Sequence, residues 1–366
     1  MLQKWLACDK LFSLRVGMPT RDMMEEVYRH VRMRNPCGIM MAWHPGTAHA
    51  ANSCSVMNFS DMFTHDISQW TRTYHKYQIA TMLRDATVLI TGGVSKEHAV
   101  LLEATRDAFL FELDHSVGVG AMVEARSNHV LLPLYDGGAI AMGGRSSMKD
   151  VLHTYEYYHP RYRTWTRGYG SLPRPLQLMA ATALFDGTIM LIGGCSVDGS
   201  ASSECYIFNP STQKFKKTAS MATARIAPAC VTTRAGHVLV TGGRNIADVE
   251  TGYYLIAREV YSSCELYDVE SDSWIPFPSM PRPSYGHWGF STPGTYIFIC
   301  TKAFQGYQVY DFNTKIWRQA ESVNMFENVN FIARFYNKDA VIAKLAEEEE
   351  EDKEDGEFEA SFALFD

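Results

Sequence analysis

Short apolar stretches recur along the chain, and each of them ends in a pair of glycines. The four copies read ATVLITGG, GAIAMGG, TIMLIGG and HVLVTGG, with glycine pairs at Gly92-Gly93, Gly143-Gly144, Gly193-Gly194 and Gly242-Gly243. The β-branched and aliphatic run predicts a buried strand, and two residues without a Cβ let the backbone turn sharply at its end. The interval of about fifty residues predicts a repeated unit of a few strands.

A pair of aromatic residues follows, with seven residues from the first to the second. The pairs are Phe63 and Trp70, Tyr158 and Trp165, Phe208 and Phe215, Tyr267 and Trp274, and Tyr310 and Trp317. The residues between them are turn formers, as in NPSTQK, DVESDS and DFNTKI, which predicts a hairpin. A degenerate copy spans Phe111 to Val117 and has no closing aromatic.

A hydrophobic strand, a glycine pair and then spaced Tyr and Trp residues resemble the Kelch repeat family, over nearly the whole chain. The resemblance implies a β-propeller, in which blades pack face to face around an axis. We therefore expect an all-β, seven-bladed Kelch-type propeller that forms one domain over residues 1–366.

The two ends of the chain predict how this ring closes. The C-terminal ASFALFD has the form of CELYD and YQVYD but lacks a following strand, and the N-terminal MLQKWLA supplies one. We expect Leu2–Leu6 to pair with Phe358–Phe365, so that an N-terminal strand and C-terminal strands complete the last blade. The segment Arg21–Asn35 fits a helix about as well as a strand, and strand order favours an innermost strand there.

Composition agrees with one large core. Hydrophobic residues make up 46% of the chain and aromatic residues 12%. The chain has no apolar run of membrane length, and its charged N-terminus is untypical of a signal peptide. We expect a cytoplasmic protein, with the nucleus as the alternative. The eight cysteines contain no C-x-x-C spacing and are expected to be free, buried thiols.

Most of the net charge of −7 comes from the acidic run Glu347–Glu359. Self-repulsion predicts that residues 347–357 form a disordered loop within the closing blade. This loop either improves solubility, attracts a basic partner or plugs a basic opening of the ring. The acidic balance, without a basic stripe interleaved with aromatics, argues against a nucleic-acid partner.

Arginines are frequent in the loops that strand order assigns to one rim of the ring. Two of them directly follow glycine pairs, and four precede innermost strands: Arg145, Arg244, Arg126, Arg174, Arg225 and Arg282. A guanidinium fork suits a carboxylate or phosphate, and a group of them in a concave site strengthens the attraction. The alternative is structural, since such an arginine can bond carbonyls of a neighbouring blade.

The resemblance implies a substrate-receptor role, because Kelch receptors bind acidic peptide segments through arginines on this rim. Arg145 and Arg244 match those positions best, and Tyr285 and His287 could add a stacking surface. The insertion 244–263 carries Tyr253 and Tyr254, which are either a partner anchor or a tip folded onto the next blade.

Catalytic motifs are missing from the sequence. The histidines of HPGTAH lack the spacing of a zinc site, and no P-loop, G-x-S-x-G or H-E-x-x-H occurs. We expect no cofactor, no metal and no enzymatic activity. The predicted function is a protein-binding scaffold or adaptor for an acidic partner segment, alone or as a subunit of a larger assembly. The alternative is a Kelch-fold enzyme, of oxidase or sugar-epimerase type, that acts on a small sugar or anionic metabolite in the central cavity.

Overall fold

The structure is a computed structural model of the whole chain. It describes residues 38–43, 53–58, 64–66, 75, 77–83, 87–94, 103–112, 115–233, 235–245, 259–286, 288–291, 296–300, 306–321 and 329–335. The predicted aromatic pair Phe63 and Trp70 and the predicted acidic loop 347–357 lie outside these residues.

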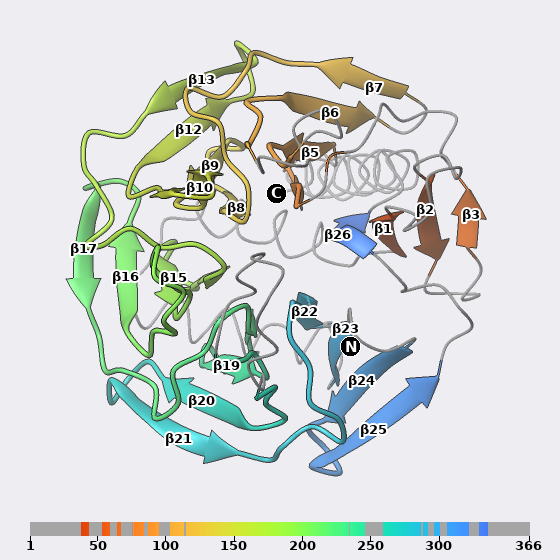
Figure 1. Cartoon of the computed structure of the whole chain (residues 1–366). Coiled ribbons are helices and arrows are strands. Elements are labelled where there is room, and N and C mark those ends of the chain that lie inside the picture. The colour runs from red at the N-terminus through yellow and green to blue at the C-terminus, as the bar shows by residue number, and fades with distance from the viewer. Residues whose placement is uncertain are drawn as a thin grey trace, which may run out of the picture.

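The described strands form antiparallel four-stranded sheets that are arranged as the blades of a ring (Figure 1). Each blade is named by its innermost strand. The β26 blade contains β26 (Val329–Phe335), β1 (Gly38–Trp43), β2 (Ser53–Asn58) and β3 (Thr64–Asp66). The β4 blade contains β4 (Ile79–Met82), β5 (Val88–Thr91), β6 (Ala108–Glu112) and β7 (His115–Gly118). The β8 blade contains β8 (Val130–Pro133), β9 (Ala139–Met142), β12 (Tyr155–His159) and β13 (Thr164–Arg167).

The other three blades have the same antiparallel order from the axis outward. The β14 blade contains β14 (Ala180–Ala183), β15 (Ile189–Ile192), β16 (Cys205–Asn209) and β17 (Lys214–Lys217). The β18 blade contains β18 (Ala229–Thr232), β19 (Val238–Thr241), β20 (Cys264–Asp268) and β21 (Ser273–Phe277). The β22 blade contains β22 (Trp288–Ser291), β23 (Tyr296–Cys300), β24 (Gly306–Asp311) and β25 (Ile316–Glu321). A small hairpin of β10 (Arg145–Ser147) and β11 (Asp150–Val151) follows β9.

The strands that end in glycine pairs are the second strands of their blades, and they are buried on both faces. Every residue of β5, β9, β15 and β19 is buried. Both faces are covered because neighbouring blades pack against each other: Ile140 and Tyr155 of the β8 blade share a core with Leu191 of the β14 blade. This explains why these strands read as continuous apolar runs.

The predicted aromatic pairs lie directly opposite each other on the two outer strands of a blade. Tyr158 pairs with Trp165 at a centroid distance of 5.2 Å, and Tyr267 pairs with Trp274 at 5.1 Å. Phe208 and Phe215, and Tyr310 and Trp317, are arranged in the same way. In the degenerate copy, Phe111 faces Ser116, so the hairpin forms without its closing aromatic.

Backbone hydrogen bonds connect one blade to the next close to the axis. Asn128, Leu178 and Ala227 have positive φ angles of 54°, 53° and 50°, and each stands two residues before an innermost strand. The N–H of Leu178 donates to the carbonyl of Asn128 (3.0 Å), and that of Ala227 donates to Leu178 (2.8 Å). In the next blade, the N–H of Gly286 donates in the same way to the carbonyl of Ala227 (2.9 Å). This chain of bonds fixes the rim residues of successive blades relative to one another.

The structure does not confirm the predicted blade count, and it differs from the prediction in the strand that lies next to β1. Among the described residues there are six four-stranded sheets, where the sequence predicted seven blades. The innermost position next to β1 belongs to β26, with Met40 opposite Ala333, and not to Arg21–Asn35. β26 also lies beside β4, the innermost strand of the following blade. A C-terminal strand therefore closes the ring by pairing with the first N-terminal sheet, while the predicted partners Leu2–Leu6 and Phe358–Phe365 lie outside the described residues.

Candidate functional site

Two kinds of segment meet on one rim of the ring. One follows the glycine pair of a blade, and the other, the approach segment, precedes the innermost strand of the next blade. In four places the N–H of the second glycine donates to a carbonyl of the approach segment: Gly93 to Arg126 (2.8 Å), Gly144 to Leu176 (2.9 Å), Gly194 to Arg225 (2.9 Å) and Gly243 to Ser284 (2.8 Å). The two groups of loops that the sequence assigned to one rim are therefore in direct contact.

The glycine pairs are required by this close contact. Gly143 has a φ of +61°, and a Cβ placed on it would lie 2.5 Å from the carbonyl oxygen of Leu176. Gly193, with a φ of +63°, would place a Cβ 2.5 Å from the carbonyl oxygen of Arg225. Any other residue would separate the two segments, so the glycines serve rim geometry and not phosphate binding.

Arg126 is one of the predicted rim residues that the structure assigns to the interior. Its side chain is fully buried and forms an ion pair with Glu156, Nε to Oε1, at 2.7 Å. Its two terminal nitrogens donate to the carbonyls of Gly143 and Thr154, to the Thr154 hydroxyl and to Glu124. Burial lowers the pKa of Arg126, and the charge of Glu156 acts in the opposite direction.

Arg225 repeats this arrangement in the β18 blade. It is fully buried, its Nη2 lies 2.9 Å from Oε1 of Glu265, and Nη1 donates to the carbonyls of Gly242 and Ser263. The prediction that Arg126 and Arg225 bind a partner is therefore wrong for this structure. Each guanidinium donates five hydrogen bonds within the protein, and these use all of its N–H donors.

The carboxylates of these pairs were missed by the sequence analysis. Glu156 also accepts the backbone N–H of Val123 at 2.6 Å, and Glu265 accepts that of Ala222 at 2.7 Å. Each glutamate therefore anchors the approach segment to the third strand of its own blade. The signal available in the sequence is that each stands two residues before the first aromatic of a pair, Tyr158 or Tyr267.

Arg145 and Arg244, the residues directly after glycine pairs, lie on the rim beside approach segments. Each forms an isolated bridge with an approach segment, Arg145 with Ser127 and Arg244 with Ile226. Arg145 is half-buried, whereas Arg244 is only 4% exposed, with Cζ 4.5 Å from the ring centroid of Tyr285. We call Arg145 and Arg244 the central arginine pair.

Cys195 stands at the same repeat position in the blade between these two arginines. Burial raises the pKa of its thiol to about 11, while the charges of Arg244 and Arg145 both act to lower it. The β14 blade, which carries Cys195, lies between the β8 blade of Arg145 and the β18 blade of Arg244, and the charges of both arginines act on its thiol. As a buried, protonated thiol, Cys195 is a neutral wall of this site and not a nucleophile.

Arg174 and Arg282 occupy a third kind of position, two residues earlier in the approach segment. Arg174 donates from Nη1 to Oε2 of Glu204 at 2.9 Å, with 42% of its side chain exposed. Glu204 also binds Lys217, and its pKa is lowered to about 2 by the hydrogen bonds from Lys217 and Arg174. Arg282 is exposed, and its backbone N–H donates to Gln308 at 3.0 Å. These two arginines belong to the approach segments of the β14 and β22 blades.

The aromatic candidates are described only in part. Tyr285 is half-buried beneath the guanidinium of Arg244. Tyr253, Tyr254 and His287 lie outside the described residues. At the base of the 244–263 insertion, the N–H of Asn245 donates to the carbonyl of Glu259 at 3.2 Å, so the two ends of the insertion are held together.

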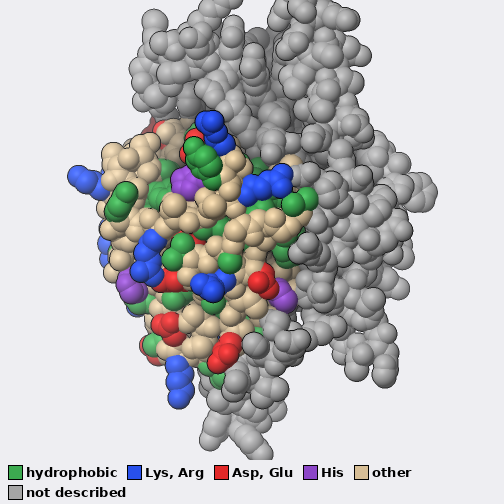
Figure 2. Space-filling model, turned by 90° about the horizontal axis from the view of Figure 1, so that it is seen from above, with side chains coloured by type: hydrophobic (Ala, Val, Ile, Leu, Met, Phe, Trp, Pro, Cys, Tyr) green, Lys and Arg blue, Asp and Glu red, His purple; other side chains and the backbone are tan. Residues whose placement is uncertain are grey.

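The outer edge of the ring is less distinctive than the rim. Figure 2 views this edge, and over its described part Lys and Arg side chains stand among Asp and Glu side chains. The described part of the chain contains no group of three His, Cys, Asp or Glu residues that could hold a metal ion. No helix among the described residues is long and apolar enough to cross a membrane. Cys195, Cys205, Cys230 and Cys264 are free thiols, of which the first, second and fourth are buried and Cys230 is half-buried.

Known proteins resemble this chain in sequence and in fold. Residues 178–222 match the Kelch motif family. Human Kelch-like protein 34 is 32% identical over 174 residues, which is 46% of this chain and 24% of that protein. Alpha-scruin from Limulus polyphemus is 26% identical over 223 residues, 56% of this chain and 23% of that protein. The matched part thus spans about a quarter of the length of these relatives. The solved structure of YjhT has a TM-score of 0.61 and 11% identity, and the match covers 78% of this chain and 97% of that chain, which shows a common fold.

Proposed function

We propose that this chain, which carries a Kelch motif and folds as a β-propeller, is a non-enzymatic protein-interaction module that binds an acidic segment of a partner at the central arginine pair. The proposal is supported by the position of Arg145 and Arg244, which follow the glycine pairs of the two blades next to that of Cys195, are each bridged to an approach segment, and both act on the Cys195 thiol through their charges. Two guanidinium groups next to a neutral, buried thiol favour an anion, and a carboxylate side chain is the anion that a protein partner offers.

The burial of Arg126 and Arg225 makes this proposal narrower than the one drawn from the sequence. Of the six candidate arginines, the central pair and Arg174 and Arg282 remain as contacts for a partner. Arg145 is the more accessible member of the central pair, while Tyr285 orients Arg244 by lying against its guanidinium. Tyr253 and Tyr254 are proposed as a second contact, from the insertion that begins at Arg244.

The experiment is affinity purification from the native cell with the unmodified protein and with R145A/R244A as baits. Each charged hydrogen bond lost should weaken binding by about 1.5–3 kcal/mol, so partner recovery should fall by at least about tenfold. Arg161 is exposed on the turn between β12 and β13 and provides the control variant R161A. R161A should recover as much partner as the unmodified protein.

A salt series distinguishes the proposed contact from an apolar one. Binding through the central arginine pair should weaken as ionic strength rises, because the partner's carboxylates are screened. Equal recovery of a partner by R145A/R244A and by the unmodified protein would refute the proposed contact. A reproducible absence of any partner would refute the adaptor function itself.

A further inference from the structure

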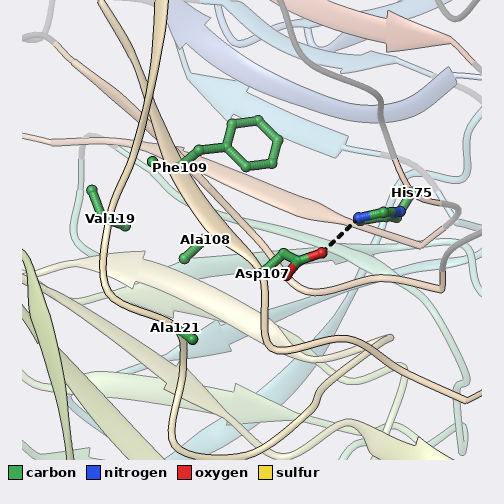
Figure 3. Close-up of a pocket in the computed structure, with 7 residues that line it drawn as sticks. His75, Asp107, Ala108, Phe109, Val119 and Ala121 are labelled. Carbon is green, nitrogen blue, oxygen red and sulfur yellow. Dashed lines mark hydrogen bonds and ion pairs between the residues drawn. The ribbon is translucent and has the colours of Figure 1, made fainter.

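A pocket opens on the arginine-bearing rim in the β4 blade, one blade before Arg126. Its volume is about 400 Å³, and it is lined by His75, Asp107, Ala108, Phe109, Gly118, Val119 and Ala121. Figure 3 shows His75 and Asp107 pointing toward one another, with Phe109, Ala108, Val119 and Ala121 around the remaining sides. The His75 Nε2 lies 2.9 Å from Oδ2 of Asp107. The N–H of Gly92 donates to the Asp107 carbonyl, which places the pocket beside a glycine pair of the rim.

The repeat shows which residues of other blades stand where this pocket stands. Tyr77 has a φ of 62° and precedes β4 by two residues, as Asn128 precedes β8. Counting back from these two residues aligns His75 with Arg126. On the third strand, Ala108 faces Thr91 as Tyr155 faces Met142.

The same register fixes two further correspondences. Asp107, just before β6, aligns with Thr154, and Phe109 aligns with Glu156. The pocket therefore occupies the place where the β8 blade holds the buried guanidinium of Arg126 against Thr154 and Glu156. The β18 blade holds Arg225 in the same way.

Smaller side chains explain why space remains in the β4 blade. Ala108 stands at the position that Tyr155 has in the β8 blade. The Tyr155 ring packs against Gly168 so closely that a Cβ on Gly168 would lie 1.9 Å from the ring. Gly118 stands where the β8 blade has Arg167, which pairs with Glu124. Tyr155 faces the β14 blade, while Glu156 holds Arg126 on the other face of the same strand. The β4 blade thus lacks an internal arginine on one face of its third strand and an aromatic ring on the other.

The chemistry that remains fits a guanidinium from another molecule. The Asp107 side chain is 59% exposed, and it stands where Thr154 accepts hydrogen bonds from Arg126. The Phe109 ring and the small apolar groups of Ala108 and Val119 suit the methylene stem of a long basic side chain. A volume of about 400 Å³ lies near the lower end of the range for small-ligand sites, about 300–1,000 Å³, which suits a single side chain.

We infer that this pocket binds an arginine side chain supplied by a partner protein, in the place where two other blades hold an arginine of their own. Asp107 receives the guanidinium, His75 holds the carboxylate through Oδ2, and Phe109 and Val119 cover the stem. The inference uses no residue of the central arginine pair and does not depend on the proposed function.

The test is an NMR titration of the full chain with n-butylguanidinium, and with n-butylurea as the neutral compound of the same shape. Butylguanidinium should bind saturably with a dissociation constant of about 1–10 mM, as expected for eight heavy atoms, and should shift the resonances of Asp107 and Phe109. Asp107→Asn should weaken binding by about tenfold or more, since it removes the charged acceptor.

Two further variants complete the test. Ala108→Tyr introduces the ring found in the β8 blade and should abolish binding, whereas D186N, at an exposed turn of the β14 blade, should leave binding unchanged. Amide spectra report whether each variant is folded, and D107N keeps the test decisive if A108Y does not fold. The inference is overturned if butylurea binds as tightly, if D107N binds like the unmodified protein, or if butylguanidinium shows no saturable binding.

Discussion

Replacing the buried pair Arg126 and Glu156 by the residues of the neighbouring blade tests whether this pair is structural. At the equivalent positions the β14 blade has Leu176 and Tyr206, so the variants are R126L, E156Y and the double variant. Each single variant leaves one charge in the interior without its main partner. Breaking a buried pair in this way costs about 3–5 kcal/mol of unfolding free energy.

The remaining contacts set the expected value within that range. After R126L, Glu156 still accepts the N–H groups of Val123 and Glu124. After E156Y, Arg126 still donates to Glu124 and to Thr154. Because each remaining charge keeps part of its hydrogen bonding, we expect about 3 kcal/mol for each single variant. The double variant removes both charges and should lose no more than either single variant.

Urea denaturation followed by tryptophan fluorescence gives the three free energies, provided that the m-value stays constant. The half-exposed Arg174 supplies the control R174L, which should cost about 1 kcal/mol or less. In the double variant the Val123 N–H has lost its acceptor, Glu156. Adding V123P to the double variant should therefore raise its stability, because proline, which the β14 blade has at the equivalent position 173, carries no N–H. If the double variant loses the sum of the two single losses, about 6 kcal/mol, the two residues do not act as a pair and our reasoning is refuted.

Three further predictions concern the core and the rim. Burial and then the charge of Arg126 lower the pKa of His129 from 6.5 to about 3, so the unfolded chain binds the extra proton. The unfolding free energy should therefore fall as pH drops from about 6.5 toward 3, and H129Q should flatten this fall; equal slopes for the two proteins would contradict it. G143A should lower the unfolding free energy by about 1–3 kcal/mol, because Gly143 has a positive φ and a Cβ there would clash with the Leu176 carbonyl. G170A should lower it by less, because the site around Gly170 is more open. Equal melting temperatures of the two variants would contradict this. W274F removes the hydrogen bond from the indole N–H to the Ala219 carbonyl, whereas W165F removes a buried indole N–H that has no hydrogen-bond partner among the described residues. W274F should therefore lower the unfolding free energy by about 0.5–1.5 kcal/mol more than W165F. A larger loss for W165F in urea titrations would argue against this prediction.

Local features of the fold could be predicted from sequence because they depend on short-range patterns. The strand before Gly143-Gly144 and the hairpin that joins Tyr158 to Trp165 follow from hydrophobicity, glycine and turn residues. The contact between each glycine pair and the next approach segment follows from antiparallel strand order. The glycine-pair contact is confirmed in the β4, β8, β14 and β18 blades, and the aromatic hairpin in the β8, β14, β18 and β22 blades.

The closure of the ring could not be predicted from such patterns. β26 pairs with β1 although nearly three hundred residues separate Met40 from Ala333. A strand pattern indicates that a segment is extended, but any free edge with a matching apolar face can receive it. Strand order in the sequence favours Arg21–Asn35 at this edge, and likeness between the C-terminal segment and other hairpins favours a seventh blade, but neither pattern encodes which strand pairs with β1.

The arginines show a second limit of sequence reasoning. An arginine before an innermost strand looks the same in sequence whether it faces solvent or the interior. The difference lies in a residue 30 or 40 positions later, Glu156 for Arg126 and Glu265 for Arg225, which only the register of the third strand brings into contact. Knowledge of that register would have separated the structural arginines from the candidates for binding.

The same comparison between blades assigns roles to the rim as a whole. The approach residue and the third-strand residue vary together: Arg126 with Glu156, Arg225 with Glu265, Leu176 with Tyr206, and Ser284 with Gln308. Each combination leaves the approach segment attached to its own blade. Where the third strand has no carboxylate, the approach segment has a proline, Pro173 or Pro281, at the position whose backbone N–H would otherwise need an acceptor. The β4 blade departs from this rule, because His75 turns to Asp107 while Phe109 offers no hydrogen bond. In this blade a histidine replaces the internal arginine and the Asp107 carboxylate stays largely exposed at the rim, so this is the place where a partner's side chain can substitute for the missing arginine.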